Sequence, residues 1–119
     1  MRTIALIVGL SFSASACLAA GPVPRMTGEE LVERFNKSAA APWTERNNEF
    51  LSGYLAGVAD ASVGKDWCDT TRVKTIEIDS DVLEQLRGLR PENRRTNAAP
   101  LVVSALKKKF PCPPTRNAR

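Results

Sequence analysis

The two cysteines in the main part of this chain constrain its fold more than any other feature. The 119 residues include three cysteines and no histidine, and Cys17 falls in an apolar N-terminal segment, which leaves Cys68 and Cys112. In an oxidising compartment two such residues form a disulfide. This bridge would close a loop of about 45 residues and stabilise the fold by about 4 kcal/mol in the chain-entropy model. The alternative is two buried free thiols.

The N-terminal segment has the features of a secretory signal peptide. A basic residue precedes an apolar stretch over residues 4–12, and small residues follow as far as Ala20. The stretch is shorter than the roughly 20 apolar residues that span a bilayer. We therefore predict a cleaved leader over residues 1–20 and a mature protein with no membrane segment. The alternative is lipidation at Cys17, although Ala14 stands where a lipidation motif needs an aliphatic residue.

The rest of the chain is long enough for one small domain. We assign a single helical domain to residues 21–114 and a flexible tail to residues 115–119. The formal net charge of +4 is too mild to indicate a nucleic-acid-binding protein. The basic clusters, Arg94-Arg95 and Lys107 to Lys109, have few aromatic neighbours. They fit a solvated surface better, and the lysines suit the C-terminal end of a helix dipole.

Helical periodicity dominates the first half of this domain. The segment from Thr27 to Glu30 fits a capping box and predicts a first helix that ends near Ser38. A second helix follows Pro42 and should end at Gly64, whose residue type suits a C-terminal cap. Its clearest apolar stripe, with a neighbouring leucine ridge, predicts the side that faces the core. The stripe consists of Phe50, Tyr54 and Val58, and the ridge consists of Leu51 and Leu55.

Two glycines on the second helix, Gly53 and Gly57, lie four residues apart. Each costs a helix roughly 1 kcal/mol relative to alanine. Two of them on one ridge predict that another helix, or a second subunit, approaches closely there.

In the second half of the domain the sequence predicts two more helices, and the first residue of each is less clearly marked. Residues 65–75 indicate a loop, and residues 75–78 fit either a short extended piece or the lead-in to a helix. Asp79 or Ser80 should cap a third helix that ends near Gly88. Pro91 should begin a fourth helix. Its apolar ridge is Ala98, Val102 and Leu106, and Pro100 should kink or restart it.

These elements predict an all-α fold, a small helical bundle of about four to five helices closed by one disulfide. The bridge between Cys68 and Cys112 would join the ends of the second and last helices. Trp67, beside the first cysteine, is interpreted either as packed over the disulfide or as an exposed interface anchor.

The residue types give little support to catalysis. Without histidine the chain has no Ser-His-Asp triad, Cys-His dyad or common zinc site. Asp60, Asp66 and Asp69 cluster near the end of the second helix, but nothing indicates the cleft and separated pKa values that an acid–base pair needs. We interpret them as solvated loop carboxylates, with Asp60 structural. The sequence therefore predicts a protein that is not an enzyme and holds no cofactor or metal.

The segment from Phe50 to Asp60 resembles the central helix of the Rap/Tai immunity proteins. The resemblance continues with Trp67-Cys68, Pro91-Glu92-Asn93-Arg94, the apolar pattern from Ala98 to Leu106, and Phe110-Pro111-Cys112, and it covers roughly residues 46–112. These are periplasmic proteins that protect bacteria from type VI secretion effectors. Two departures are Pro100, inside the apolar pattern, and Thr70, where a proline is common.

This resemblance implies a periplasmic, helical, disulfide-bonded protein, often a homodimer, that binds and blocks a peptidoglycan amidase effector. Its partner-binding residues should lie in two loops, residues 65–74 and residues 86–95. The candidates are Lys65, Asp66, Trp67, Asp69, Arg72, Arg87, Arg90, Glu92 and Arg94. The alternative is a periplasmic holdase, an acid-stress chaperone-like helical dimer, although the absence of histidine weakens a switch near pH 6. A scaffold homologue without an effector partner also fits the sequence.

Overall fold

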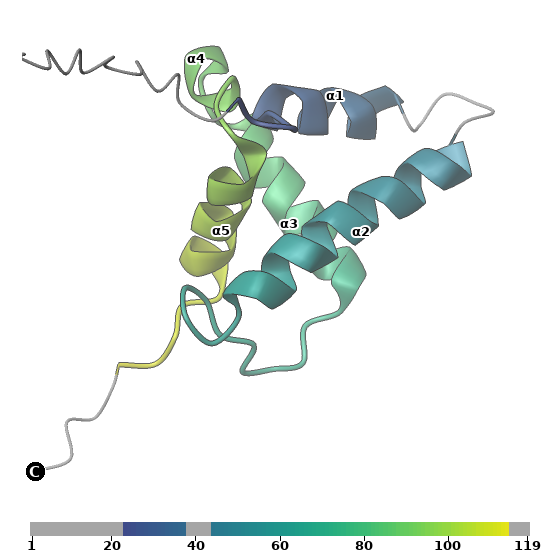
Figure 1. Ribbon diagram of the computed structural model, residues 1–119. Helices are drawn as coiled ribbons and strands as arrows, with labels where there is room; N and C mark the ends of the chain where they lie inside the picture. The colour runs from purple at the N-terminus through teal and green to yellow at the C-terminus, as the bar shows by residue number, and fades with distance from the viewer. Residues whose placement is uncertain (1–22, 38–43, 115–119) are drawn as a thin grey trace, which may run out of the picture.

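The computed structural model describes residues 23–37 and 44–114 of the chain. These residues contain five α-helices and no strand: α1 (Gly28–Lys37), α2 (Thr44–Ser62), α3 (Thr75–Arg87), α4 (Pro91–Arg94) and α5 (Ala98–Lys109). Figure 1 shows α4 at one end of the bundle and the loop between α2 and α3 at the other end. The prediction of a small all-α bundle is confirmed. The predicted leader, residues 1–20, and the predicted tail, residues 115–119, lie outside the described residues.

The capping box predicted at the start of α1 is present. The backbone N–H of Thr27 donates to Glu30 Oε2 at 2.8 Å, and the backbone N–H of Glu30 donates to Thr27 Oγ1 at 3.2 Å. These two bonds satisfy backbone donors that a helix start leaves without an internal partner. The helix ends at Lys37, one residue before the predicted end.

The core-facing side of α2 is not the stripe that the sequence predicted. Leu51 and Leu55 are fully buried, whereas Phe50 is 51% exposed and Tyr54 and Val58 are half-buried. Both α3 and α5 pack against α2, so the leucine ridge points at them and the aromatic stripe lies at the edge. Periodicity identified the apolar side of the helix, but the packing partners decided which ridge becomes the centre.

The third helix begins earlier than predicted, and Asp79 and Ser80 do not cap it. It starts at Thr75, which settles residues 75–78 as helical. The backbone N–H of Lys74 donates to Glu77 Oε2 at 3.3 Å and so closes the first turn. Asp79 therefore lies inside the helix, where it is buried and only 9% exposed. The predicted end near Gly88 is confirmed, since α3 ends at Arg87.

The predicted fourth helix is two helices in the structure, and each has a proline in its first turn. Pro91 is the first residue of the short helix α4. A new helix, α5, starts at Ala98, with Asn97 as its N-cap and Pro100 in its first turn. There the missing N–H of proline removes no internal hydrogen bond. Of the two predicted outcomes, kink or restart, the chain shows the restart.

The disulfide holds the other end of the bundle. Cys68 and Cys112 are bonded at an S–S distance of 2.02 Å. The backbone N–H of Cys68 also donates to the carbonyl of Phe110 at 3.0 Å. The bridge thus joins the loop after α2 to the segment after α5, as predicted. The core between the two ends is formed by Leu31, Leu51, Leu55, Val82, Leu86, Ala98, Val102 and Leu106, each at most 1% exposed.

Candidate partner-binding site

The two predicted partner-binding loops lie at opposite ends of the bundle (Figure 1). Helix α3 runs from the first loop to the second, and its 13 residues span about 20 Å. Residues 65–74 therefore flank the disulfide, whereas residues 86–95 surround α4. The predicted residues form two separate surfaces and cannot be one compact site.

At the disulfide end, the predicted residues divide into exposed charges and one buried aromatic side chain. Lys65, Asp66 and Arg72 are exposed, and Asp69 accepts a hydrogen bond from the backbone N–H of Val73 at 3.0 Å. Trp67 is only 3% exposed. This loop therefore covers a core residue and presents a charged outer surface.

The indole of Trp67 is fixed by the end of α2. Its Nε1–H donates to the carbonyl of Ala59 at 3.1 Å and to Ser62 Oγ at 3.2 Å. Its ring lies 6.0 Å from the ring of Phe110, in a tilted arrangement. Because Trp67 is buried and its polar N–H is bonded within the chain, the interpretation as an exposed anchor is wrong. The alternative, in which the ring packs over the disulfide, stays a prediction.

At the α4 end, two of the predicted arginines hold the fold together. Arg94 Nε donates to Glu29 Oε2 at 2.8 Å, and Arg94 Nη1 donates to the carbonyl of Arg87 at 3.1 Å. Arg87 itself donates to Asn36 Oδ1 at 2.7 Å. These side chains connect α4 to α1 and α3. Arg90 and Glu92 differ, since they form an exposed ion pair at 3.2 Å that a partner could reach.

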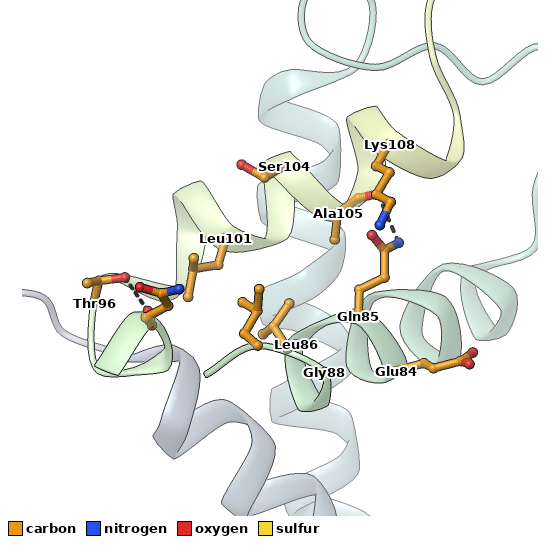
Figure 2. Close-up of a pocket in the computed structure, with 11 residues that line it drawn as sticks. Glu84, Gln85, Leu86, Gly88, Thr96, Leu101, Ser104, Ala105 and Lys108 are labelled. Carbon is orange, nitrogen blue, oxygen red and sulfur yellow. Dashed lines mark hydrogen bonds between the residues drawn. The ribbon is translucent and has the colours of Figure 1, made fainter. Parts of the chain in front are cut away.

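A groove lies beside α4. It has a volume of about 680 Å³ and lies between α3, α4 and α5. Its lining residues are Glu84, Gln85, Leu86, Gly88, Leu89, Asn93, Thr96, Leu101, Ser104, Ala105 and Lys108. Figure 2 shows Gln85 and Leu86 of α3 on one side of the groove and Leu101 and Ala105 of α5 on the other, with Gln85 donating to the carbonyl of Ala105 at 3.1 Å. Apolar side chains form the floor, and Glu84 and Lys108 lie at one edge.

The sequence prediction reached only part of this groove. The predicted loop contributes Leu86, Leu89 and Asn93, but the wall from α5 was missed because Leu101 and Ser104 lie beside its core ridge. In the sequence, Leu101 and Ser104 are only a leucine and a serine beside the core ridge. They can be recognised as one wall of a groove only once α3 is seen to pack against α5.

The glycine ridge of α2 faces outward. A Cβ built on Gly53 or Gly57 meets no atom within 4 Å, so no described part of this chain approaches the ridge closely. The ridge borders a shallow apolar depression of about 500 Å³, formed by Gly53, Tyr54, Gly57, Val58, Ala61, Ser62, Ala99 and Val103. The alternative of a second subunit stays a prediction.

From the sequence we interpret Asp60 as a structural carboxylate, and we do not single out Asp79 as buried. Asp60 is exposed, and it is Asp79 that is buried. Ser52 Oγ donates to Asp79 Oδ2 at 2.6 Å, whereas Asp79 Oδ1 has no hydrogen-bond partner among the described residues. Burial raises the pKa of the Asp79 carboxyl, and the hydrogen bond from Ser52 partly opposes that rise. No group of acidic or cysteine side chains in residues 23–37 and 44–114 could hold a metal ion.

A family model described as Rap1a immunity proteins matches residues 27–112. The chain belongs to the Rap1a immunity protein family. The matched segment begins at the capping residue of α1 and ends at the second cysteine of the disulfide. A comparison with curated proteins found no match.

Rap1a membership indicates an immunity protein directed against a secreted effector, in a family that is typically not enzymatic. The Rap1a match includes both loop surfaces, the groove and the glycine ridge. In a Rap1a protein these surfaces are therefore the candidates for contact with an effector or with another protein chain. None of the helices formed by the described residues has the length and apolar character needed to cross a membrane.

Proposed function

We propose that this protein is a periplasmic immunity protein that binds a type VI secreted peptidoglycan amidase and blocks its active cleft. The match to the Rap1a model over residues 27–112 is the observation that carries this proposal. The leader-like residues 1–20 support export to the periplasm, and the motif resemblance over residues 46–112 supports an amidase as the target.

The groove between α3, α4 and α5 is the surface that best fits effector binding. It is concave and combines an apolar floor with polar residues in its lining, which is typical of sites that bind a partner's side chains. Glu84 and Lys108 at its edge would orient the effector segment rather than supply most of the affinity. Inhibition then needs no chemistry from the immunity protein, since a bound surface excludes the substrate.

The rigidity of both ends supports tight binding. The disulfide fixes one loop, and the contacts of Arg94 fix the other. A surface that is ordered before binding loses less conformational entropy when the complex forms. We therefore expect the affinity for the effector to fall when a side chain blocks the groove, and also when the contacts that hold the two ends are removed.

Co-expression with candidate type VI secreted peptidoglycan amidases tests the proposal. Periplasmic amidase alone should stop growth, and the wild-type immunity protein should restore growth and bind the amidase in a stable complex. Ser104→Arg, which places a long charged side chain in the groove, should weaken binding by about tenfold or more, as expected for about 1.4 kcal/mol. Ser80→Arg, on the exposed side of α3, is the matched control and should bind normally. The absence of both a complex and growth rescue with wild type would contradict the proposal.

We also propose that two copies associate through the outward side of α2. Gly53 and Gly57 contribute nothing to packing within the described chain, although each lowers helix stability by roughly 1 kcal/mol. A flat ridge between an exposed Phe50 and an exposed Ala61 suits close contact with an identical ridge.

The dimer has a test that does not involve the effector. Gly57→Leu should give a monomer by light scattering with size-exclusion chromatography, because its side chain separates the two ridges. Its folded content by circular dichroism should remain that of wild type, since a side chain at this position meets no atom of the same chain. A wild-type protein that is monomeric at high concentration would refute the dimer.

A further inference from the structure

A second pocket lies at the disulfide end of the bundle, away from the groove. It has a volume of about 250 Å³ and is formed by the C-terminal half of α2, the loop before α3 and the first turns of α3. Its lining residues are Ala56, Ala59, Asp60, Val63, Trp67, Asp69, Val73, Thr75, Ile78 and Asp79. Three of these residues are aspartates, and none is lysine or arginine.

The deepest of these carboxylates is incompletely bonded. Asp79 is 9% exposed, and it accepts one hydrogen bond, from Ser52 Oγ to Oδ2 at 2.6 Å. Its Oδ1 atom is buried and has no partner among the described residues. A buried acceptor without a hydrogen bond loses the hydration that it had in water and gains nothing in return. A donor that enters the pocket and reaches this carboxylate would recover part of that loss.

The pocket also lacks a counter-ion of its own. The ion pairs found in the described segments join Glu33 to Lys37, Glu92 to Arg90, Glu29 to Arg94 and Asp81 to Lys109. None of them uses an aspartate of the pocket. The adjacent loop carries three basic residues, Lys65, Arg72 and Lys74, and all three are exposed. A chain with a formal net charge of +4 thus keeps a concave acidic surface without neutralising it.

We propose that this pocket receives the cationic side chain of an arginine or lysine from the effector. This inference rests on the proposed function, because it supplies a second contact with the same partner. A metal ion does not fit, since no group of carboxylates in residues 23–37 and 44–114 could hold one. A guanidinium or ammonium group has several donors on a long apolar stem, so it can reach separated carboxylates while the stem packs beside Trp67.

The raised pKa of Asp79 gives the contact a pH dependence. Burial raises the pKa of this carboxyl, and the hydrogen bond from Ser52 opposes the rise. The other titratable groups of the pocket are Asp60, from α2, and Asp69, from the loop. A cation binds the ionised carboxylates, so its affinity should increase as the pH rises through the pKa of Asp79.

A small probe tests the pocket without the effector. We expect Nα-acetyl-arginine amide to shift the backbone amide NMR signals of residues 56–63 and 67–79 in a saturable way, with a dissociation constant in the millimolar range. The neutral Nα-acetyl-glutamine amide should not. Asp79→Asn keeps the oxygen that accepts from Ser52 and removes the charge, so it should weaken probe binding by about tenfold, the effect of about 1.4 kcal/mol. Asp81→Asn is the matched control, on the same helix but outside the pocket, and it should bind the probe like wild type.

The result also separates this inference from the proposed function. Failure of the probe to saturate, or equal binding by wild type and Asp79→Asn, would overturn the pocket even if the protein neutralises an amidase. With the amidase itself, Asp60→Asn and Asp79→Asn should each raise the dissociation constant, and Asp81→Asn should not. If the wild-type protein binds the probe but no amidase, the pocket binds cations as proposed, but its occupant is not a side chain of an amidase effector.

Discussion

The two ends of this bundle are fastened by different means. At one end the disulfide between Cys68 and Cys112 links the loop after α2 to the segment after α5. At the other end the chain before α1 lies against the chain before α5. There the backbone N–H of Gly28 donates to the carbonyl of Thr96 at 3.1 Å, and the backbone N–H of Ala98 donates to the carbonyl of Met26 at 2.9 Å.

The disulfide end is therefore held by a covalent bond, whereas the α4 end is held by close packing and backbone hydrogen bonds. A disulfide acts mainly by restricting the unfolded chain, so it tolerates an open loop such as residues 65–74. Backbone pairing needs the two segments to touch, so the α4 end has no spare space around Gly28. We therefore expect the disulfide end to depend on redox conditions and the α4 end to depend on side-chain volume.

Removal of the disulfide should have the largest effect. Cys68→Ala combined with Cys112→Ala frees a loop with a sequence separation of 44 residues, and the free energy of unfolding should fall by about 4 kcal/mol. Urea denaturation followed by circular dichroism measures the change. Hydrogen exchange should show the loss of protection first at Trp67 and Cys68, and later at Gly28 and Ala98. Equal loss at both ends would show that the two ends are not independent.

The substitution Gly28→Ala should cause the next largest loss. A Cβ at this position would lie 2.6 Å from Leu101 Cδ1 and 2.9 Å from the carbonyl oxygen of Arg94. The leucine can move, but the backbone carbonyl cannot move without distorting α4. We expect a loss of about 1–3 kcal/mol in the free energy of unfolding.

Gly88→Ala is the matched control for this substitution. A Cβ on Gly88 would be 3.5 Å from the nearest atom, an ordinary contact, and its φ of −73° suits any residue. Its free energy of unfolding should stay within about 0.5 kcal/mol of wild type. Equal effects of the two substitutions would show that the α4 end is not closely packed.

Local signals in the sequence predicted the start of α1 and the ends of α1 and α3 well, but not the start of α3. The capping box at Thr27 and Glu30 and the prolines at the starts of α4 and α5 depend on neighbouring residues, so they can be recognised without a structure. The need for Gly28 to lack a side chain could not be predicted, because Leu101 and Arg94 approach it from distant parts of the chain. The same holds for the choice between the Phe50 stripe and the Leu51 ridge.

The candidate site was predictable only in outline. The disulfide and the two loops followed from the cysteines, the helix ends and the family resemblance. Their position at opposite ends depends on the direction of α3, which no motif reports. The burial of Asp79 was missed for a similar reason, since its position after a short apolar run fits both an N-cap and a helix interior.

Two arginine–glutamate pairs near α4 can show how much polar side-chain contacts add to the stability of this end. Arg94 is 19% exposed and bonds both Glu29 and a backbone carbonyl, so Arg94→Met should cost about 1–2 kcal/mol. Arg90 is 78% exposed in its pair with Glu92, so Arg90→Met should change the free energy of unfolding by well under about 1 kcal/mol. Parallel urea denaturation of the two variants measures the difference. Equal losses would mean that the Arg94 contacts add nothing to the packing.

The smallest predicted effect is a difference in pH dependence between the two ends. Near the disulfide, burial raises the pKa of Asp79 above its ordinary 3.8, so the folded state binds a proton more tightly than the unfolded state. The stability from this carboxyl is therefore complete at low pH and is lost as the pH rises through the raised pKa. Asp79→Asn should remove that decrease.

At the α4 end, Glu30 should act in the opposite direction. The hydrogen bond from the Thr27 backbone lowers the pKa of the Glu30 carboxyl below its ordinary 4.5. The stability that Glu30 contributes is present above the ordinary value and is lost as the pH falls through the lowered pKa. Urea midpoints of wild type, Asp79→Asn and Glu30→Gln, measured from about pH 3 to about pH 7, should therefore diverge in opposite directions. Parallel curves would mean that the capping carboxylate and the buried carboxylate respond alike to pH, and that the two ends differ only in their covalent link.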